Sequence, residues 1–428
     1  MIPLSAQHPT LFRLVISHYL VSAICFVVLA GLLLYSSGDL SGHYFQPHLL
    51  AITHLATLGW GTLIIFGACY QLLPVILETE IYSYKMGWIS VALFILGLFV
   101  LVYSFWIFEP GLHMQCGSLL LLSGISLFGI NTFITSKKIN KPDINQEFII
   151  TACIWLIGTA ILGTLLVFNF QYAFLPKDHI LFLKLHAHMG IAGWFLMLII
   201  GVSSKLIPMF LVSIKQKPIY LSWSYYLVNT GLLLFLIDTY LFGLNIKSYV
   251  AAIIVVAGVA SWLIFVFYCF RFRMRKSIDL PIMHTVLSFF LLTIAIVLLP
   301  FIIYYQMKGD PQAIANTNLY GTLLFMGWIS SLILGQTFKT LPFIIWIKHY
   351  QHLAGKGTIP MPADLFNKKM LAIQFTIFLI FIGSFYPGLF LKSTWLVNTG
   401  LLCFLIVAIV YLTNVMIVLL HKPQIKEL

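Results

Sequence analysis

Apolar stretches of about 20 residues recur along this 428-residue sequence, and few charged residues interrupt them. Each stretch is long enough to cross the hydrocarbon core of a bilayer as an α-helix. Only 8% of the residues are charged, against about 25% in a soluble domain, so the chain cannot cover a water-facing surface. The sequence therefore predicts an all-α membrane protein with twelve transmembrane helices, at residues 11–37, 50–77, 85–107, 114–136, 147–170, 180–211, 218–243, 248–270, 280–305, 316–346, 368–391 and 394–420.

Basic residues are divided unevenly between alternate loops. The net charge is +12, from 24 Lys and Arg against 12 Asp and Glu. With the N-terminus in the cytoplasm, nineteen of the 24 fall on the cytoplasmic side, and the other five are Lys177, Lys184, Lys247, Lys308 and Lys392. This bias follows the positive-inside rule and predicts that both termini are cytoplasmic. We expect a bacterial inner-membrane protein embedded in lipid, with no nucleic-acid partner.

Three segments of the sequence align without gaps at offsets of 134 residues. They read HLATLGWGTLIIFGACYQLLPVI from His54, HMGIAGWFLMLIIGVSSKLIPMF from His188 and TLLFMGWISSLILGQTFKTLPFI from Thr322. Several coincident positions at equal offsets indicate an internal repeat rather than a chance likeness of apolar helices. The shared positions are Gly59-Trp60, Gly67 and Pro74; Gly193-Trp194, Gly201 and Pro208; and Gly327-Trp328, Gly335 and Pro342.

The repeated segments are the second, sixth and tenth predicted spans, so the predicted fold is three four-helix repeats. All three copies cross the membrane in the same direction, which indicates parallel repeats with pseudo-threefold symmetry about the membrane normal. The inverted repeats of many transporters would need opposite directions. We expect one membrane domain over residues 1–428, with repeats at about 1–140, 141–275 and 276–428.

Histidines at membrane depth are costly and are usually functional. His54 lies a few residues inside the second span and His188 holds the matching position in the sixth, so both are candidate axial ligands of one haem. His186 is a further candidate, but residues two apart on a helix point about 200° apart, so it cannot share one metal with His188 on a regular helix. In the structural alternative, each ring hydrogen-bonds to a neighbouring helix. His43 and His48, in the loop before the second span, are candidate metal ligands or haem-propionate contacts.

The remaining polar residues of the spans have plainer interpretations. We interpret His18 and His284, toward the inner helix ends, as structural. Lys205 and Lys339 also lie at inner ends, where a long side chain can reach the headgroups by snorkelling. No CxxC or CxxCH motif occurs, which excludes covalent c-type haem attachment in this chain.

The predicted topology resembles subunit I of the haem-copper oxidases, a superfamily that includes the nitric oxide reductases. The segment from His54 is similar to the second helix of the reductases, where a His opens the helix and a Gly-Ala-x-Tyr-x-Leu-x-Pro run closes it. The resemblance implies that His54 ligates a low-spin haem. The haem-and-copper NnrS proteins of nitric oxide metabolism, with His on helices 2 and 6, are a further similar family.

The sequence departs from the oxidase pattern at the binuclear centre. The tenth span has Tyr320, Gly321 and Thr322 where the family has His-x-His, and no His-His pair occurs. We therefore expect a haem-binding protein of respiratory electron transfer or nitric oxide metabolism, with copper as a second candidate metal and without a standard oxygen-reducing centre. The resemblance also implies a redox partner or oxidase subunits, and it does not decide whether the chain is an enzyme. The alternative is a twelve-helix transporter or an oxidase assembly factor without a redox cofactor.

Overall fold

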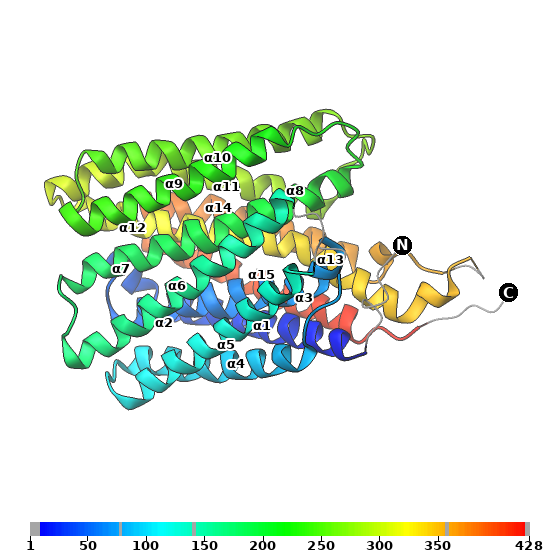
Figure 1. Cartoon of the computed structure of the whole chain (residues 1–428), viewed down its shortest axis with the longest axis horizontal. Coiled ribbons are helices and arrows are strands. Elements are labelled where there is room, and N and C mark those ends of the chain that lie inside the picture. The colour runs from blue at the N-terminus through cyan, green and yellow to red at the C-terminus, as the bar shows by residue number, and fades with distance from the viewer. Residues whose placement is uncertain (1–8, 77–78, 139–142, 356–358, 424–428) are drawn as a thin grey trace. The chain divides into compact units, whose positions relative to one another are not determined.

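The structure is a computed structural model that describes residues 9–76, 79–138, 143–355 and 359–423. Regular structure in these residues is helical, apart from an isolated β-bridge between Ser213 and Arg273. Among the described residues, twelve helices are long and apolar enough to cross a membrane, so the chain is a multi-pass membrane protein. They are Thr10–Tyr35, Pro47–Ile76, Tyr84–Ile107, Leu112–Ser136, Ile144–Tyr172, His179–Leu211, Ile219–Phe242, Lys247–Arg271, Leu280–Lys308, Gln312–Leu353, Lys368–Phe390 and Thr394–Leu419 (Figure 1).

The twelve predicted spans are confirmed as long apolar helices, and the tenth is longer than predicted. The sequence predicted residues 316–346, whereas the helix covers Gln312–Leu353, 42 residues. At 1.5 Å per residue this helix is about 63 Å long. A bilayer with its headgroups is about 45 Å thick, so the helix continues beyond the membrane. The apolar pattern marks the part of the helix in lipid, and it does not mark where a helix ends in water.

Short polar residues fix the start of several spans by capping. The first N–H groups of a helix have no partner within it, and a side-chain oxygen just before the helix can accept from one of them. Such caps break the apolar sequence at the membrane surface. They are Ser83 of α4 (Tyr84–Ile107), Asp143 of α6 (Ile144–Tyr172), Asp178 of α7 (His179–His188) and Asn367 of α14 (Lys368–Phe390).

The chain forms two compact units, and unit 1 comprises Met1–Pro74, Ile278–Leu298 and Ile314–Leu428. Its core includes Phe26, which stacks on Trp60 at 4.1 Å between ring centroids and meets Phe404 edge-on. Its elements are α1 (Pro9–Tyr35), η2 (Ser37–Ser41), α2 (Pro47–His54), η3 (Leu55–Thr62), most of α3 (Leu63–Ile76), the first part of α11 (Leu280–Lys308), most of α12 (Gln312–Thr322), η5 (Leu323–Ile329), α13 (Ser330–Tyr350), η6 (Gln351–Leu353), η7 (Pro362–Asp364), α14 and α15 (Thr394–Leu419).

Unit 2 comprises Val75–Ser277 and Leu299–Ala313. Small residues bring its helices close together: a Cβ at Gly97 of α4 would lie 2.6 Å from the Leu121 backbone nitrogen of α5 (Leu112–Ser136). Unit 2 also contains α6, α7, η4 (Met189–Leu196), α8 (Met197–Leu211), α9 (Ile219–Phe242), α10 (Lys247–Arg271) and the last part of α11. α4 and α5 lie side by side, as do α9 and α10 (Figure 1).

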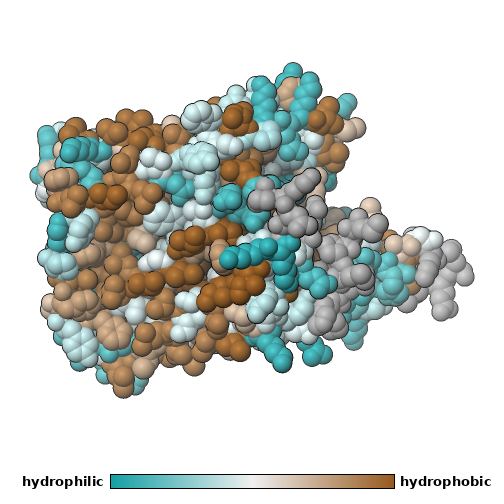
Figure 2. Space-filling model, viewed as in Figure 1, coloured by the Kyte–Doolittle hydropathy of each residue, from teal (hydrophilic) through white to brown (hydrophobic). Residues whose placement is uncertain are grey.

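Apolar side chains cover much of the visible surface of the molecule (Figure 2). Helix α9 of unit 2 is an example, since it exposes Trp223, Tyr226, Leu233 and Ile237. Such a surface is unstable in water and suits contact with lipid tails. The surface therefore agrees with the length and composition of the spans.

Candidate functional site

The first residue of each repeated segment stands directly before a π-helical segment. His54 precedes η3, His188 precedes η4 and Thr322 precedes η5. The segments begin at residues 55, 189 and 323, which are 134 residues apart. A π-helix has i→i+5 hydrogen bonds, is rare, and is frequent at functional sites. The backbone is therefore altered at corresponding places in three spans.

The ring of His54 in unit 1 is oriented by its own helix. Its Nδ1 lies 2.7 Å from the backbone oxygen of Leu50, one turn earlier in α2. A carbonyl oxygen can only accept, so Nδ1 carries the proton and donates it. In the neutral ring the lone pair is then on Nε2, which is the state of a ligating histidine. The side chain is half-buried, so it keeps accessible surface.

His188 in unit 2 has the same arrangement. Its Nδ1–H donates to the Lys184 carbonyl oxygen at 2.8 Å, one turn earlier in α7. The ring lies against Phe235 of α9, with 4.4 Å between ring centroids, and it is half-buried. The two repeat-related histidines therefore have the same tautomer, fixed by the same local hydrogen bond.

His186 faces a different neighbour. Its Nδ1–H donates to the Thr159 carbonyl oxygen of α6 at 3.0 Å. A Cβ at Gly163 of α6 would lie 2.8 Å from the ring, so this glycine makes room for the imidazole. His186 thus packs against α6 while His188 packs against α9. An interhelical hydrogen bond of this kind is what the structural alternative expects of a membrane histidine.

His54 and His188 meet the chemical requirements of an axial haem ligand. Such a ligand needs an unprotonated ring nitrogen and a second interaction that holds the ring in place. In both residues the Nδ1–H···O=C hydrogen bond supplies the second interaction and leaves the lone pair on Nε2. Each of the two rings, taken by itself, therefore fits the role of an axial haem ligand.

The loop histidines are held by local contacts in unit 1. The Nδ1 of His48 lies 2.7 Å from an Asp39 carboxylate oxygen. His43 accepts at Nδ1 from the Phe45 N–H at 3.1 Å and stacks on Tyr44. Across the parts of the chain that the structure describes, no group of three or more His, Cys, Asp or Glu side chains is arranged to hold a metal ion. Copper therefore stays a prediction from the resemblance.

The third repeat position has a contact that the sequence does not reveal. The Tyr386 hydroxyl of α14 donates to the Thr322 backbone oxygen at 3.1 Å. It also lies 3.0 Å from where a Cβ at Gly327 would be. A phenol thus contacts the backbone where the other two copies carry His54 and His188. No sequence motif surrounds Tyr386, so only the packing of α14 identifies it.

The lone glycines of the three copies pack in the same way against the preceding span. A Cβ at Gly67, Gly201 or Gly335 would lie 2.7, 2.6 or 2.6 Å from the Cβ of His18, Phe148 or His284, respectively. His18 and His284 are fully buried at these contacts. All three pairs therefore share one geometry, in which the glycine allows the two helices to approach closely.

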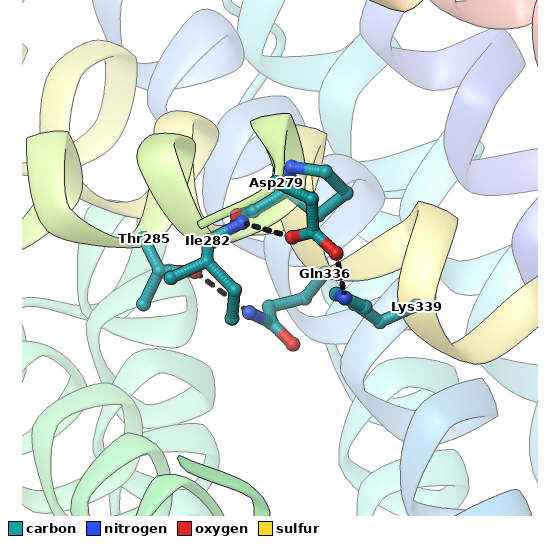
Figure 3. A network of polar contacts seen from close by, with 6 residues as sticks. Asp279, Ile282, Thr285, Gln336 and Lys339 are labelled. Atoms are coloured by element: carbon teal, nitrogen blue, oxygen red, sulfur yellow. Dashed lines mark hydrogen bonds and ion pairs between the residues drawn. The ribbon is translucent and has the colours of Figure 1, made fainter. Parts of the chain in front are cut away.

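Polar residues connect α11 and α13 within unit 1 (Figure 3). Lys339 forms an ion pair with Asp279, which also accepts from the Ile282 N–H at the start of α11. One turn earlier in α13, the Gln336 amide donates to the Thr285 hydroxyl at 2.7 Å. Snorkelling is therefore not the explanation for Lys339: its side chain is 13% exposed and its ammonium pairs with a carboxylate. Asp279, two residues before Pro281, has the sequence position of a helix cap, which could have identified it.

No protein-family description and no curated protein sequence match this chain.

Proposed function

We propose that this protein binds haem in the membrane and that His54 and His188 each supply an axial imidazole. The observation that carries the proposal is the matched state of the two rings, each with Nδ1 bonded to the carbonyl one turn earlier and each directly before a π-helical segment. Haem with two imidazoles would supply reversible one-electron transfer, and it would bind a diatomic gas only if one imidazole were displaced. The chain would supply the ligands, their orientation and an apolar surrounding.

The wider proposal is a divergent relative of haem-copper oxidase subunit I, built from three parallel four-helix repeats. It is supported by the coincidence of Gly-Trp, the π-helical segment, the packed glycine and the proline in three spans at equal offsets. In an experimental structure, the second, sixth and tenth spans should then superpose under rotations of about 120°, as three equal copies require. Two inverted halves would contradict the proposal.

We propose a bacterial inner-membrane location with both termini in the cytoplasm. In the predicted topology, nineteen of the 24 Lys and Arg residues lie on the same side of the membrane, and this bias supports the orientation. Fusions of a cytoplasmic fluorescent protein to the C-terminus should fluoresce. Fusions of a phosphatase that is active only outside the cytoplasm should be inactive at the same site.

The test of haem binding is the spectrum of the purified protein and its histidine variants. The wild type should have a Soret band and, when reduced, sharp α and β bands. His54→Ala and His188→Ala should each lose the low-spin spectrum and insert normally, whereas His186→Ala should keep it. If His186→Ala loses the low-spin spectrum and His188→Ala keeps it, the second axial ligand is His186. A colourless, well-folded wild type would contradict haem binding and favour the transporter or assembly factor.

A role in electron transfer or nitric oxide binding suits this site better than oxygen reduction at a haem–copper centre. The third repeat position has Thr322 in place of a histidine, and the sequence has no His-His pair. We therefore expect no cyanide-sensitive oxygen uptake by the purified chain. Robust uptake by this single chain would overturn that assignment.

A further inference from the structure

Lys184 lies one helical turn before His188 on α7. The Lys184 carbonyl oxygen accepts the Nδ1–H of His188 at 2.8 Å, so the two residues occupy the same face of the helix. Side chains on a helix lean toward its N-terminus, which directs the long Lys184 chain away from the imidazole and toward the start of α7. A cation therefore stands beside a candidate haem ligand, nearer the start of α7.

The environment of Lys184 differs from that of the other lysines at this end of unit 2. Lys177, Lys247 and Lys308 are exposed, whereas Lys184 is half-buried. The Lys184 ammonium donates to the Gln306 amide oxygen at 3.3 Å, a long contact with a neutral group. Within the described residues Lys184 forms no ion pair. The nearby Asp178 instead caps α7 by accepting from a backbone N–H.

Partial burial of an ammonium without a direct ion pair is costly, because desolvation disfavours the charge and the nearby Asp178 offsets only part of that cost. A ligand with an anionic group at this place would remove the cost. Haem is such a ligand, since it carries two propionate carboxylates at one edge. A buried propionate in turn requires a cation or several hydrogen-bond donors.

We propose that the Lys184 ammonium pairs with a haem propionate, an inference that rests on the proposed ligation by His188. Lys184 is then a positioning residue that fixes the rotation of the haem about its axial bond and raises its reduction potential. The same ammonium could meet an anionic lipid headgroup. Its partial burial and its place on the His188 face favour the carboxylate of the bound cofactor.

The test uses the full-length haem protein in lipid nanodiscs, with the midpoint potential as the readout. Lys184→Gln should lower the potential, because a lost cation near the iron favours the oxidised, more positive state. Lys184→Arg should restore it in large part, since Arg keeps the charge. Lys177→Gln is the matched control: it removes an exposed lysine near the start of the same helix, whose ammonium contacts the Tyr240 ring, and should leave the potential unchanged.

The lipid composition separates the two sources of negative charge. The shift caused by Lys184→Gln should be equal in zwitterionic and in anionic nanodiscs. A shift seen only in anionic nanodiscs would assign the contact to lipid and overturn the proposal. A wild-type potential in Lys184→Gln in both lipids would also overturn it and leave haem binding intact. A colourless wild type, or unchanged low-spin haem in His188→Ala, would instead remove the ligation on which the inference rests.

Discussion

Replacing Gly335 with Ala should loosen the contact between α13 and α11 in unit 1. The added Cβ would lie 2.5 Å from the Pro281 carbonyl oxygen and 2.6 Å from the His284 Cβ. Real Cβ contacts below 3.0 Å are essentially unknown, so the helices must separate by at least 0.5 Å. The oxygen belongs to the backbone and cannot turn away. The movement would also disturb the Ser331 hydroxyl, which donates to the His284 carbonyl oxygen at 2.9 Å.

The expected net loss is up to about 2 kcal/mol of unfolding free energy. Overpacking a close contact typically costs about 1–3 kcal/mol. The better helix propensity of Ala offsets about 1 kcal/mol of this loss. Gly383→Ala is the matched control, because Gly383 lies in α14 of the same unit and its Cβ would meet nothing within 4 Å. That variant should be neutral or slightly stabilised.

Unfolding of the purified variants in detergent, followed by tryptophan fluorescence during titration with a denaturing detergent, measures these differences. Gly67→Ala and Gly201→Ala extend the series to the other two copies, where the closest atoms are the Cβ of His18 and of Phe148. Both variants should lose stability, and less than Gly335→Ala, because neither has a backbone oxygen within 3.0 Å. If Gly335→Ala is as stable as Gly383→Ala, close packing at this glycine is not needed and the reasoning fails.

Three further predictions concern contacts within unit 1. Asp279→Asn keeps a capping oxygen and removes the charge that faces Lys339. The Asp279 and Lys339 side chains are 33% and 13% exposed, so the energy of this ion pair should lie between that of an exposed and that of a buried pair. Thermal unfolding should therefore show a loss of about 1–2 kcal/mol in unfolding free energy. Asn318→Ala removes hydrogen bonds to the Leu40 and Gly42 carbonyl oxygens and should speed limited proteolysis at residues 36–46, with intact wild-type rates contradicting it. Burial lowers the pKa of His421 below its usual 6.5, so the folded state binds fewer protons and stability should fall below about pH 6.5. His421→Gln should weaken that dependence in melting curves, and an unchanged slope would refute it.

The spans could be predicted because lipid imposes a simple rule on the sequence. An apolar run of sufficient length must be helical at membrane depth, and capping residues such as Ser83 and Asp143 mark where it starts. The tenth span was longer than this rule predicted, mainly at its C-terminal end. Beyond the apolar stretch, α13 continues through Lys348 and His349 to the buried Tyr350. Helix propensity and packing stabilise this part of the helix, and a hydropathy pattern reveals neither of these two causes.

The candidate site could be predicted in part. The repeat identified His54 and His188 as equivalent, but the sequence cannot show which ring nitrogen carries the proton, because that depends on the rotamer and the carbonyl it reaches. It likewise gives no sign of the hydroxyl of Tyr386, which comes from a helix distant in sequence. Polar contacts between helices distant in sequence depend on how the helices pack, and no sequence pattern marks which residues will meet.

The third copy of the repeat has the π-helical segment but lacks the histidine that precedes this segment in the other two copies. There η5 keeps its place although Thr322 replaces the histidine, and hydroxyls from Tyr386 and Ser330 donate to the carbonyl oxygens of Thr322 and Phe325. Ser330 also accepts from the Trp60 indole at 3.0 Å. The altered backbone is thus stabilised by its neighbours and does not require an imidazole. By the same reasoning, His54→Ala should remove a ligand and leave the helix and its membrane insertion intact, so loss of the haem spectrum in that variant reports on ligation and not on folding.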